Sequence, residues 1–236
     1  MNFKSHIYWK LVYPLVNLSD KLKGLDFLSV VNAEESGLDP NVSYNSSPSS
    51  SRFLKEVFSD FNFSPNSSII DIGCGKGSAM RTMLKYPFVK VDGIEFSSHV
   101  ANIAVHNFKR LRANRSQVFM GDATKFDGYD AYNFVYFFNP FSAVVMVEVM
   151  ERLVQSVRRS DRELVIIYMN PTCDEVIVNT QVFRKAGIYC RKGNWLTVYS
   201  NRDYNHSTLS ANARMYRIDE HPQMESDLKT YLQNSI

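Results

Sequence analysis

Three glycines at alternate positions, Gly73, Gly75 and Gly77, follow a short apolar run that ends with the acidic residue Asp71 and Ile72. Glycine lets a backbone approach a bound cofactor closely and adopt positive φ angles. A strand, a tight glycine turn and a helix in this order open a nucleotide-binding βαβ unit. The dinucleotide pattern G-x-G-x-x-G would need a glycine at position 78, where the chain has serine, and the P-loop pattern is absent. These residues therefore indicate a glycine loop that holds a nucleotide-type cofactor other than a dinucleotide.

Two further acids follow the next predicted strands. Glu95 ends a strand predicted for residues 89–95 and precedes Phe96, whereas Asp122 follows a strand predicted for 116–120 and precedes Ala123. Ligands of an open parallel sheet bind outside the carboxyl ends of its strands, so we expect both acids beside the glycine loop. The carboxylate of Glu95 can accept hydrogen bonds from both ribose hydroxyls, and such charge-assisted bonds contribute roughly 1.5–3 kcal/mol. The carboxylate of Asp122 can accept a hydrogen bond from an adenine amino group.

The string D-x-G-x-G-x-G at 71–77 resembles motif I of the class I S-adenosylmethionine-dependent methyltransferases, and the acids at 95 and 122 extend the resemblance over residues 50–200. It implies a Rossmann-like fold, S-adenosylmethionine as the cofactor and methyl transfer as the reaction. A nicotinamide enzyme would share the strand and glycine turn but not this spacing. The resemblance implies a cofactor-binding set of Asp71, Gly73, Cys74, Gly75, Gly77, Glu95, Phe96, Asp122, Ala123 and Phe138.

The fourth predicted strand ends in Asn139-Pro140-Phe141. This string is similar to part of the Asn-Pro-Pro-[Tyr/Phe] motif of methyltransferases that act on amino groups, in which asparagine and a proline carbonyl hold the acceptor nitrogen and the aromatic ring stacks on it. The resemblance implies a catalytic or acceptor-holding role for Asn139, Pro140 and Phe141, although only one proline is present. Asn-Pro is also an ordinary way for a chain to leave a strand. Both interpretations stay open.

An alcohol acceptor also needs a group that takes its proton, commonly a histidine or a carboxylate. His99 and His106 are seven residues apart on a predicted helix, and we interpret both as surface residues. Asp174 and Tyr168 lie near the end of the fifth predicted strand and are better placed, but no motif supports them.

Composition is that of a globular protein with a core: 236 residues, 44% hydrophobic and 22% charged, with a net charge of +3. This slight charge argues against the dense basic face of a non-specific nucleic-acid binder, although it is compatible with a local basic patch. Cys74, Cys173 and Cys190 have no metal-ligand spacing, so we expect no metal site and interpret them as reduced thiols of a cytoplasmic protein. No apolar run is long enough for a membrane span, and the oligomeric state is open.

Alternating strand and helix patterns predict an α/β fold, a Rossmann-like seven-stranded mostly parallel sheet with helices on both faces and a final β-hairpin. We predict strands at 68–72, 89–95, 116–120, 132–138, 163–169, 188–191 and 196–200. The helix predicted for 174–185 is expected to end near Gly187. Residues after 205 are interpreted as a tail with one possible helix.

The domain prediction is an N-terminal helical extension or lid over residues 1–48, a methyltransferase domain over 49–205 and a C-terminal tail over 206–236. Ile7, Leu11, Leu15 and Leu18 fall on one helical face, and Pro14 is expected to bend or break that helix. This segment is interpreted as a packed helix or lid, with a membrane-leaning surface as the alternative.

Further strings at 71–77, 93–95, 139–141 and 166–171 are shared with uncharacterised bacterial methyltransferases, some of which belong to surface-glycan or small-molecule pathways. This resemblance favours methyl transfer to a small-molecule or glycan-precursor acceptor. Two alternatives remain: an N-methyltransferase that acts on nucleic acid or protein through residues 139–141, and a catalytically inactive cofactor-binding partner subunit.

Overall fold

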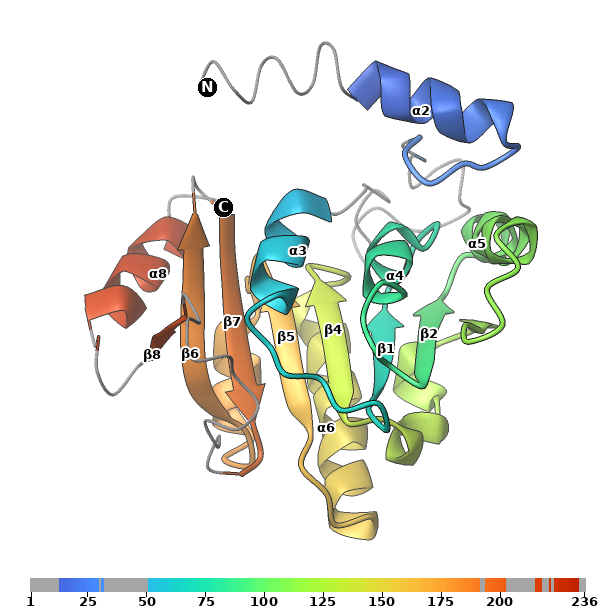
Figure 1. Cartoon of the computed structure of the whole chain (residues 1–236). Helices are drawn as coiled ribbons and strands as arrows, with labels where there is room; N and C mark the ends of the chain where they lie inside the picture. The colour runs from blue at the N-terminus through green and yellow to red at the C-terminus, as the bar shows by residue number, and fades with distance from the viewer. Residues whose placement is uncertain are drawn as a thin grey trace.

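The computed structural model describes residues 13–29, 31, 51–191, 194–202, 215–217, 221 and 223–233. A single sheet with the order β3-β2-β1-β4-β5-β7-β6-β8 forms its centre (Figure 1). The strands are β1 (Ser68–Ile72), β2 (Lys90–Glu95), β3 (Val118–Met120), β4 (Phe134–Phe138), β5 (Val165–Met169), β6 (Arg184–Arg191), β7 (Asn194–Ser200) and β8 (Tyr216–Arg217).

Strands β3, β2, β1, β4 and β5 pair in parallel, and β7 pairs antiparallel with both β5 and β6. This arrangement confirms the predicted Rossmann-like sheet with its closing hairpin. The parallel strands are added in sequence to one side of β1 as β2 and β3, and then to its other side as β4 and β5. The carboxyl ends of β1, β2 and β4 meet at one edge. A ligand-binding crevice is expected at such a switch point.

Helices cover both faces of the sheet, as predicted. On one face α3 (Ser51–Phe58), α4 (Ser78–Met83) and α5 (Ser98–Arg110) contribute to an apolar cluster with Ile69 of β1. On the other face α6 (Ala143–Arg159) and α7 (Asp174–Asn179) pack against Ile70 and Ile72. Ile69 on one face of β1 and Ile70 and Ile72 on the other therefore serve two cores, which explains why this strand has apolar residues on both faces.

The segment after α7 differs from the sequence prediction. The predicted helix over 174–185 ends at Asn179, because the chain turns at Gln181, whose φ is +55°. The hydroxyl of Thr180 accepts backbone hydrogen bonds from Val182 and Phe183 in this turn, each 3.3 Å long. Gly187 therefore ends no helix; it lies within β6, where a Cβ atom would come 2.6 Å from Cγ of Met215.

Two elements follow β7. Helix α8 (Gln223–Gln233), the expected terminal helix, packs Leu228 against Ile188 and Trp195 of the hairpin. The two-residue strand β8 pairs antiparallel with β6 and adds an eighth strand to the predicted seven. The sequence analysis missed β8 because a two-residue strand has no periodic pattern.

At the N-terminal end, α2 (Tyr13–Leu22) carries Pro14 in its first described turn, where a proline is tolerated. Ile7 and Leu11 of the predicted helical face lie outside the described residues. Within the described part of the chain, no helix is long and apolar enough to cross a membrane. In Figure 1, α2 lies beyond the carboxyl ends of β1 and β2, above α4 and α5.

Candidate functional site

The glycine loop between β1 and α4 is held in a backbone conformation that requires glycine. Gly73, Gly75 and Gly77 have φ angles of +76°, +54° and +85°. The N–H groups of Gly73 and Cys74 both donate to the carbonyl oxygen of Ile94, at 2.9 and 3.0 Å, which fixes the loop to the end of β2. A side chain at any of these glycines would strain the turn.

Glu95, at the end of β2, faces this loop with a largely buried carboxylate. Its Oε2 accepts a 2.9 Å hydrogen bond from the N–H of Gly75, and its Oε1 accepts one of 2.9 Å from the N–H of Ser97. Burial raises the pKa of Glu95, and these backbone hydrogen bonds oppose the shift. A carboxylate has about four lone-pair sites, so Glu95 can still accept a hydrogen bond from a ligand hydroxyl group.

Asp71 adds a second carboxylate at the same edge. Its burial, followed by the nearby charge of Glu95, raises the pKa of Asp71 well above its usual range. Burial and the same two carboxylates raise the pKa of the Cys74 thiol, so this cysteine is a neutral thiol without the reactivity of a thiolate. Asp71 and Glu95 are therefore two buried acids at one edge of the sheet, and a positively charged group beside them would favour their ionised forms.

Apolar side chains and open space lie at the ends of β2 and β3. Phe96 and Met120 are both well exposed. Because Glu95 pairs with Met120, Phe96 and Met120 lie at the same edge of the sheet. A Cβ atom built on Gly121 would meet no other atom within 4 Å. Asp122, the next residue, uses its carboxylate to accept hydrogen bonds from the N–H and Oγ1 of Thr124, at 2.9 and 2.7 Å. The site thus offers room and apolar contact for a planar ring.

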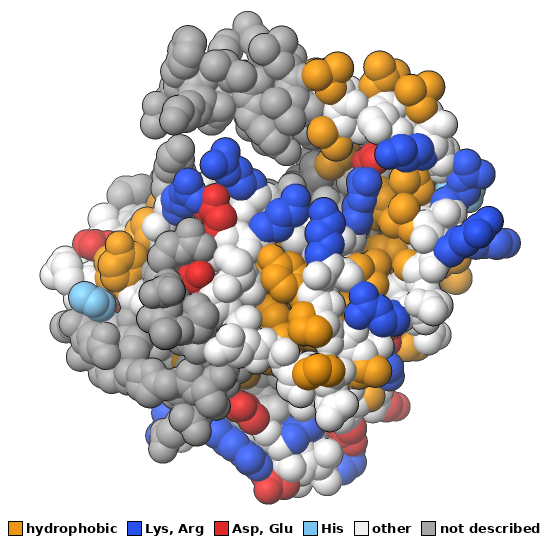
Figure 2. Space-filling model, in the orientation of Figure 1, with side chains coloured by type: hydrophobic (Ala, Val, Ile, Leu, Met, Phe, Trp, Pro, Cys, Tyr) orange, Lys and Arg blue, Asp and Glu red, His pale blue; other side chains and the backbone are white. Residues whose placement is uncertain are grey.

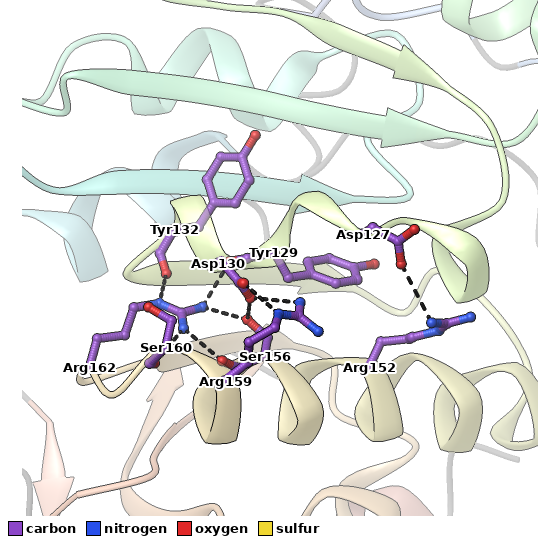
Figure 3. Close-up of polar contacts among 9 residues, drawn as sticks. All are labelled: Asp127, Tyr129, Asp130, Tyr132, Arg152, Ser156, Arg159, Ser160 and Arg162. Atoms are coloured by element: carbon purple, nitrogen blue, oxygen red, sulfur yellow. Dashed lines mark hydrogen bonds and ion pairs between the residues drawn. The ribbon is translucent and has the colours of Figure 1, made fainter.

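The loop from Asp122 to β4 is fixed by arginines of α6 and of the turn after it (Figure 3). Arg152 donates from Nε to the carbonyl oxygen of Thr124 at 2.7 Å, and Arg162 donates to the carbonyl oxygens of Tyr129 and Tyr132 at 2.8 and 2.7 Å. Asp130 accepts hydrogen bonds from Ser156 and Arg159. These contacts hold residues 124–132, between β3 and β4, in place, although they touch no predicted site residue directly.

Residues of the N-terminal segment support the glycine loop from outside. Lys76, within the loop, forms a 2.7 Å ion pair with Asp26 and a hydrogen bond with Ser29. The side-chain amide of Asn107 on α5 donates to the backbone oxygens of both Asp26 and Lys76, at 2.8 and 3.1 Å, and accepts from the N–H of Asp26 at 2.8 Å. Sequence reasoning missed these residues; a lysine between two loop glycines was the available signal.

At the ends of β4 and β5, two asparagines adopt positive φ angles and precede prolines: Asn139 at +41° and Asn170 at +52°. Oδ1 of Asn139 accepts a hydrogen bond from the hydroxyl of Thr172. Pro140 packs on the glycine loop, where a Cβ atom on Gly73 would come 2.5 Å from Cβ of Pro140. The structure therefore brings Asn139 and Pro140 to the same edge as Asp71 and Glu95.

Phe141 takes a different position. Its ring is buried in the apolar cluster on the α6 face and packs edge-on against Phe137, with the ring centroids 6.2 Å apart. Phe138 is partly exposed at the end of β4.

The candidate proton acceptors near β5 are committed to other contacts. Asp174 is buried in an ion pair with Lys185, at 2.7 Å, and accepts a hydrogen bond from the hydroxyl of Tyr199. Lys185 also contacts Glu225 of α8 at 2.7 Å, so this group ties α7, the hairpin and α8 together. Burial raises the pKa of Tyr168, which keeps its hydroxyl neutral. His99 and His106 are exposed on α5, as expected.

A family model described as a methyltransferase domain matches residues 69–162. This range contains the glycine loop, the buried acids Asp71 and Glu95, the loop that begins at Asp122, and residues 139–141. Comparison with curated proteins finds no match.

Solved structures share the fold at low sequence identity. A putative S-adenosyl-L-methionine-dependent methyltransferase from Methanococcus maripaludis aligns with a TM-score of 0.50 and 15% identity over 66% of this chain and 86% of that chain. A SAM-dependent methyltransferase from Aquifex aeolicus aligns with a TM-score of 0.47 and 15% identity over 66% and 98%. The mitomycin 7-O-methyltransferase MmcR aligns with a TM-score of 0.49 and 16% identity over 64% of this chain and 53% of that chain, about half its length.

Proposed function

We propose that this protein, whose residues 69–162 match a methyltransferase-domain family model, uses S-adenosylmethionine and transfers its methyl group to a small-molecule or glycan-precursor acceptor. The observation that carries the proposal is the convergence of buried carboxylates and a hydrogen-bonded asparagine at one sheet edge. Asp71 and Glu95 lie on the cofactor side of this edge, and Asn139 lies on the β4 side.

The cofactor-side residues fit the bound group chemically. S-adenosylmethionine, when bound, supplies a methyl group activated on a sulfonium. We assign to Glu95 the two ribose hydroxyls, because its carboxylate retains free lone pairs at the loop. Burial and the charge of Glu95 raise the pKa of Asp71, and a cationic ligand beside it would favour its ionised form, so the site favours such a ligand. Phe96 and the open space at Gly121 fit an adenine ring, with Asp122 and Ala123 beside it.

The acceptor-side residues support a neutral polar acceptor. Asn139 presents an amide whose orientation is set by Thr172, and Pro140 fixes this turn against the glycine loop. In-line transfer requires the acceptor atom within about 3–3.5 Å of the methyl carbon, so a rigid turn beside the cofactor loop has a positioning role. Carboxylates and cations are absent among Asn139, Pro140, Tyr168 and Thr172, which favours acceptors with hydroxyl or amine groups over charged polymers.

The rival N-methyltransferase on nucleic acid or protein has less support. It needs an aromatic ring open to a planar acceptor, whereas Phe141 is buried against Phe137. Tight binding of RNA or DNA that weakens steeply with salt would nevertheless favour this rival.

The test begins with calorimetric titration of S-adenosylmethionine, S-adenosylhomocysteine and NAD into the full chain. We expect the first two ligands to bind and NAD to leave no heat of binding. A panel of sugar nucleotides, small alcohols, amines, RNA and peptides is then incubated with methyl-labelled S-adenosylmethionine. Label transfer to a small molecule supports the proposal, transfer to RNA or peptide supports the rival, and cofactor binding without transfer supports an inactive partner subunit.

A further inference from the structure

Helix α2 buries a charge and exposes its leucines. Among its described side chains, Asp20 is buried at 2% exposure, whereas Leu15, Leu18 and Leu22 are 66%, 55% and 80% exposed. A helix on the surface of a globular domain ordinarily shows the reverse pattern. The leucines recur at helical spacing and therefore share one face, which we call the leucine face. Figure 2 shows apolar side chains at this upper corner of the molecule.

The outward orientation of the leucine face is fixed by contacts of the same segment. Asp20 forms a 2.7 Å ion pair with Arg81 of α4, and Arg81 also lies 4.7 Å above the ring of Phe27. Just after the helix, the carbonyl oxygen of Lys23 accepts two hydrogen bonds from Arg110 of α5. Rotation of α2 to bury its leucines would break the Asp20–Arg81 ion pair. The leucines are therefore held toward solvent by the fold.

Positive charge surrounds the leucine face. Lys21 and Lys23 are exposed, and within the described ranges neither forms an ion pair. Both acids of residues 13–29 are neutralised by ion pairs, Asp20 with Arg81 and Asp26 with Lys76. The adjoining helix α5 ends with Lys109 and Arg110 and contains no acid. Figure 2 shows Lys and Arg side chains next to the apolar corner. An apolar face bordered by cations matches the chemistry of an anionic lipid surface.

We infer that the leucine face docks this protein on an anionic phospholipid membrane. In this arrangement the three leucines enter the boundary between headgroups and acyl chains, and Lys21 and Lys23 contact the lipid phosphates. Since α2 lies beyond the carboxyl ends of β1 and β2, docking turns the cofactor edge of the sheet toward the membrane. In sequence, the preceding residues include Trp9 and Lys10, types that are common at membrane interfaces.

The test uses the full chain and sedimentation with vesicles. Wild-type protein is mixed with vesicles of phosphatidylglycerol and phosphatidylcholine, or of phosphatidylcholine alone, at low and high salt. We expect binding to the anionic vesicles that weakens with salt. Leu18→Ser/Leu22→Ser is expected to lower the apparent affinity at least tenfold, because two apolar side chains no longer leave water on docking. Lys21→Gln/Lys23→Gln is expected to abolish the preference for anionic vesicles.

Val89→Ser is the matched control, because Val89 is also exposed but lies at the opposite end of the sheet, before β2. It should bind vesicles like the wild type. Retained binding of S-adenosylhomocysteine by every variant shows that the fold and cofactor site are intact, so membrane docking is tested apart from methyl transfer. Wild-type protein that stays in the supernatant with anionic vesicles overturns the inference. A leucine variant that binds vesicles as well as the wild type also overturns it. The same holds if light scattering shows that the leucine substitutions only convert a dimer to a monomer.

Discussion

Replacement of Asp26 by alanine would leave the ammonium group of Lys76 buried without its partner. The Lys76 side chain is 3% exposed and that of Asp26 is 35% exposed. Removal of one partner from a fully buried ion pair costs about 3–5 kcal/mol. Because Asp26 is partly hydrated, we expect a smaller loss of about 2–3 kcal/mol in the free energy of unfolding. For a chain of this size, that corresponds to a fall in Tm of roughly 5–10 °C.

The same substitution should loosen the glycine loop, since Asp26 and Asn107 together hold Lys76. We therefore expect weaker binding of S-adenosylhomocysteine to Asp26→Ala, measured by calorimetry below its Tm. Asp20→Ala is the matched control: it breaks an ion pair of the same segment, but its partner Arg81 is 33% exposed and remains hydrated. It should cost about 1 kcal/mol and leave ligand affinity unchanged.

A second substitution distinguishes a stranded charge from a general loss of packing. Lys76→Met in the Asp26→Ala background removes the unpaired ammonium, and we expect it to restore most of the lost stability in urea denaturation. Full stability of Asp26→Ala, or no recovery on adding Lys76→Met, would refute the reasoning. Burial alone would raise the pKa of Asp26, but the hydrogen bonds from Lys76 and Ser29 bring it below its ordinary value. The contribution of the pair is thus present above about pH 4 and lost as the pH falls through this lowered pKa.

Three further substitutions test the assigned site residues. Glu95→Ala should weaken S-adenosylhomocysteine binding at least tenfold while the circular dichroism spectrum stays native, and unchanged affinity would remove Glu95 from the site. Asp71→Asn should raise the Tm of the ligand-free protein at neutral pH and lower its affinity for S-adenosylmethionine. A carboxyl group with a raised pKa stabilises the fold only while it is protonated, and this contribution is lost as the pH rises through the raised pKa. A lower Tm of Asp71→Asn would contradict this reasoning. Asn139→Gly, which keeps the positive φ without strain, should retain ligand binding and lose turnover on the acceptor identified by the panel, whereas full turnover would leave Asn139 a turn residue.

The central sheet was predictable because local patterns define it. Ser68–Ile72 was predicted with its observed bounds, since a short run rich in isoleucine is cut off by glycines that need positive φ. The meeting of Asp71 and Glu95 at one edge was predictable for a related reason: parallel strands bring their last residues to the same edge of a sheet.

Other features depend on partners that no local pattern contains. The turn after α7 requires a positive φ at Gln181, and glutamine in a sequence does not indicate a positive φ. The helix predicted over 174–185 was therefore too long. The support of Lys76 by Asp26 joins residues 50 positions apart, and that of Asp26 by Asn107 joins residues 81 apart. Such pairs are visible only once the fold has brought them together. The domain boundaries at 48 and 205, and the roles assigned to the site residues, stay predictions.

The attachment of the N-terminal segment also constrains the order in which the chain folds. Residues 20–29 leave the ribosome first, yet their anchors lie between Lys76 and Arg110. Closure of a loop of about 80 residues carries an entropic cost that is repaid only after α5 has docked on the sheet. Pairing of β1 with β2 and β4 needs none of these contacts. The outer support of the glycine loop therefore needs the chain as far as Arg110, so a nascent chain that lacks α5 has a cofactor loop without its full support.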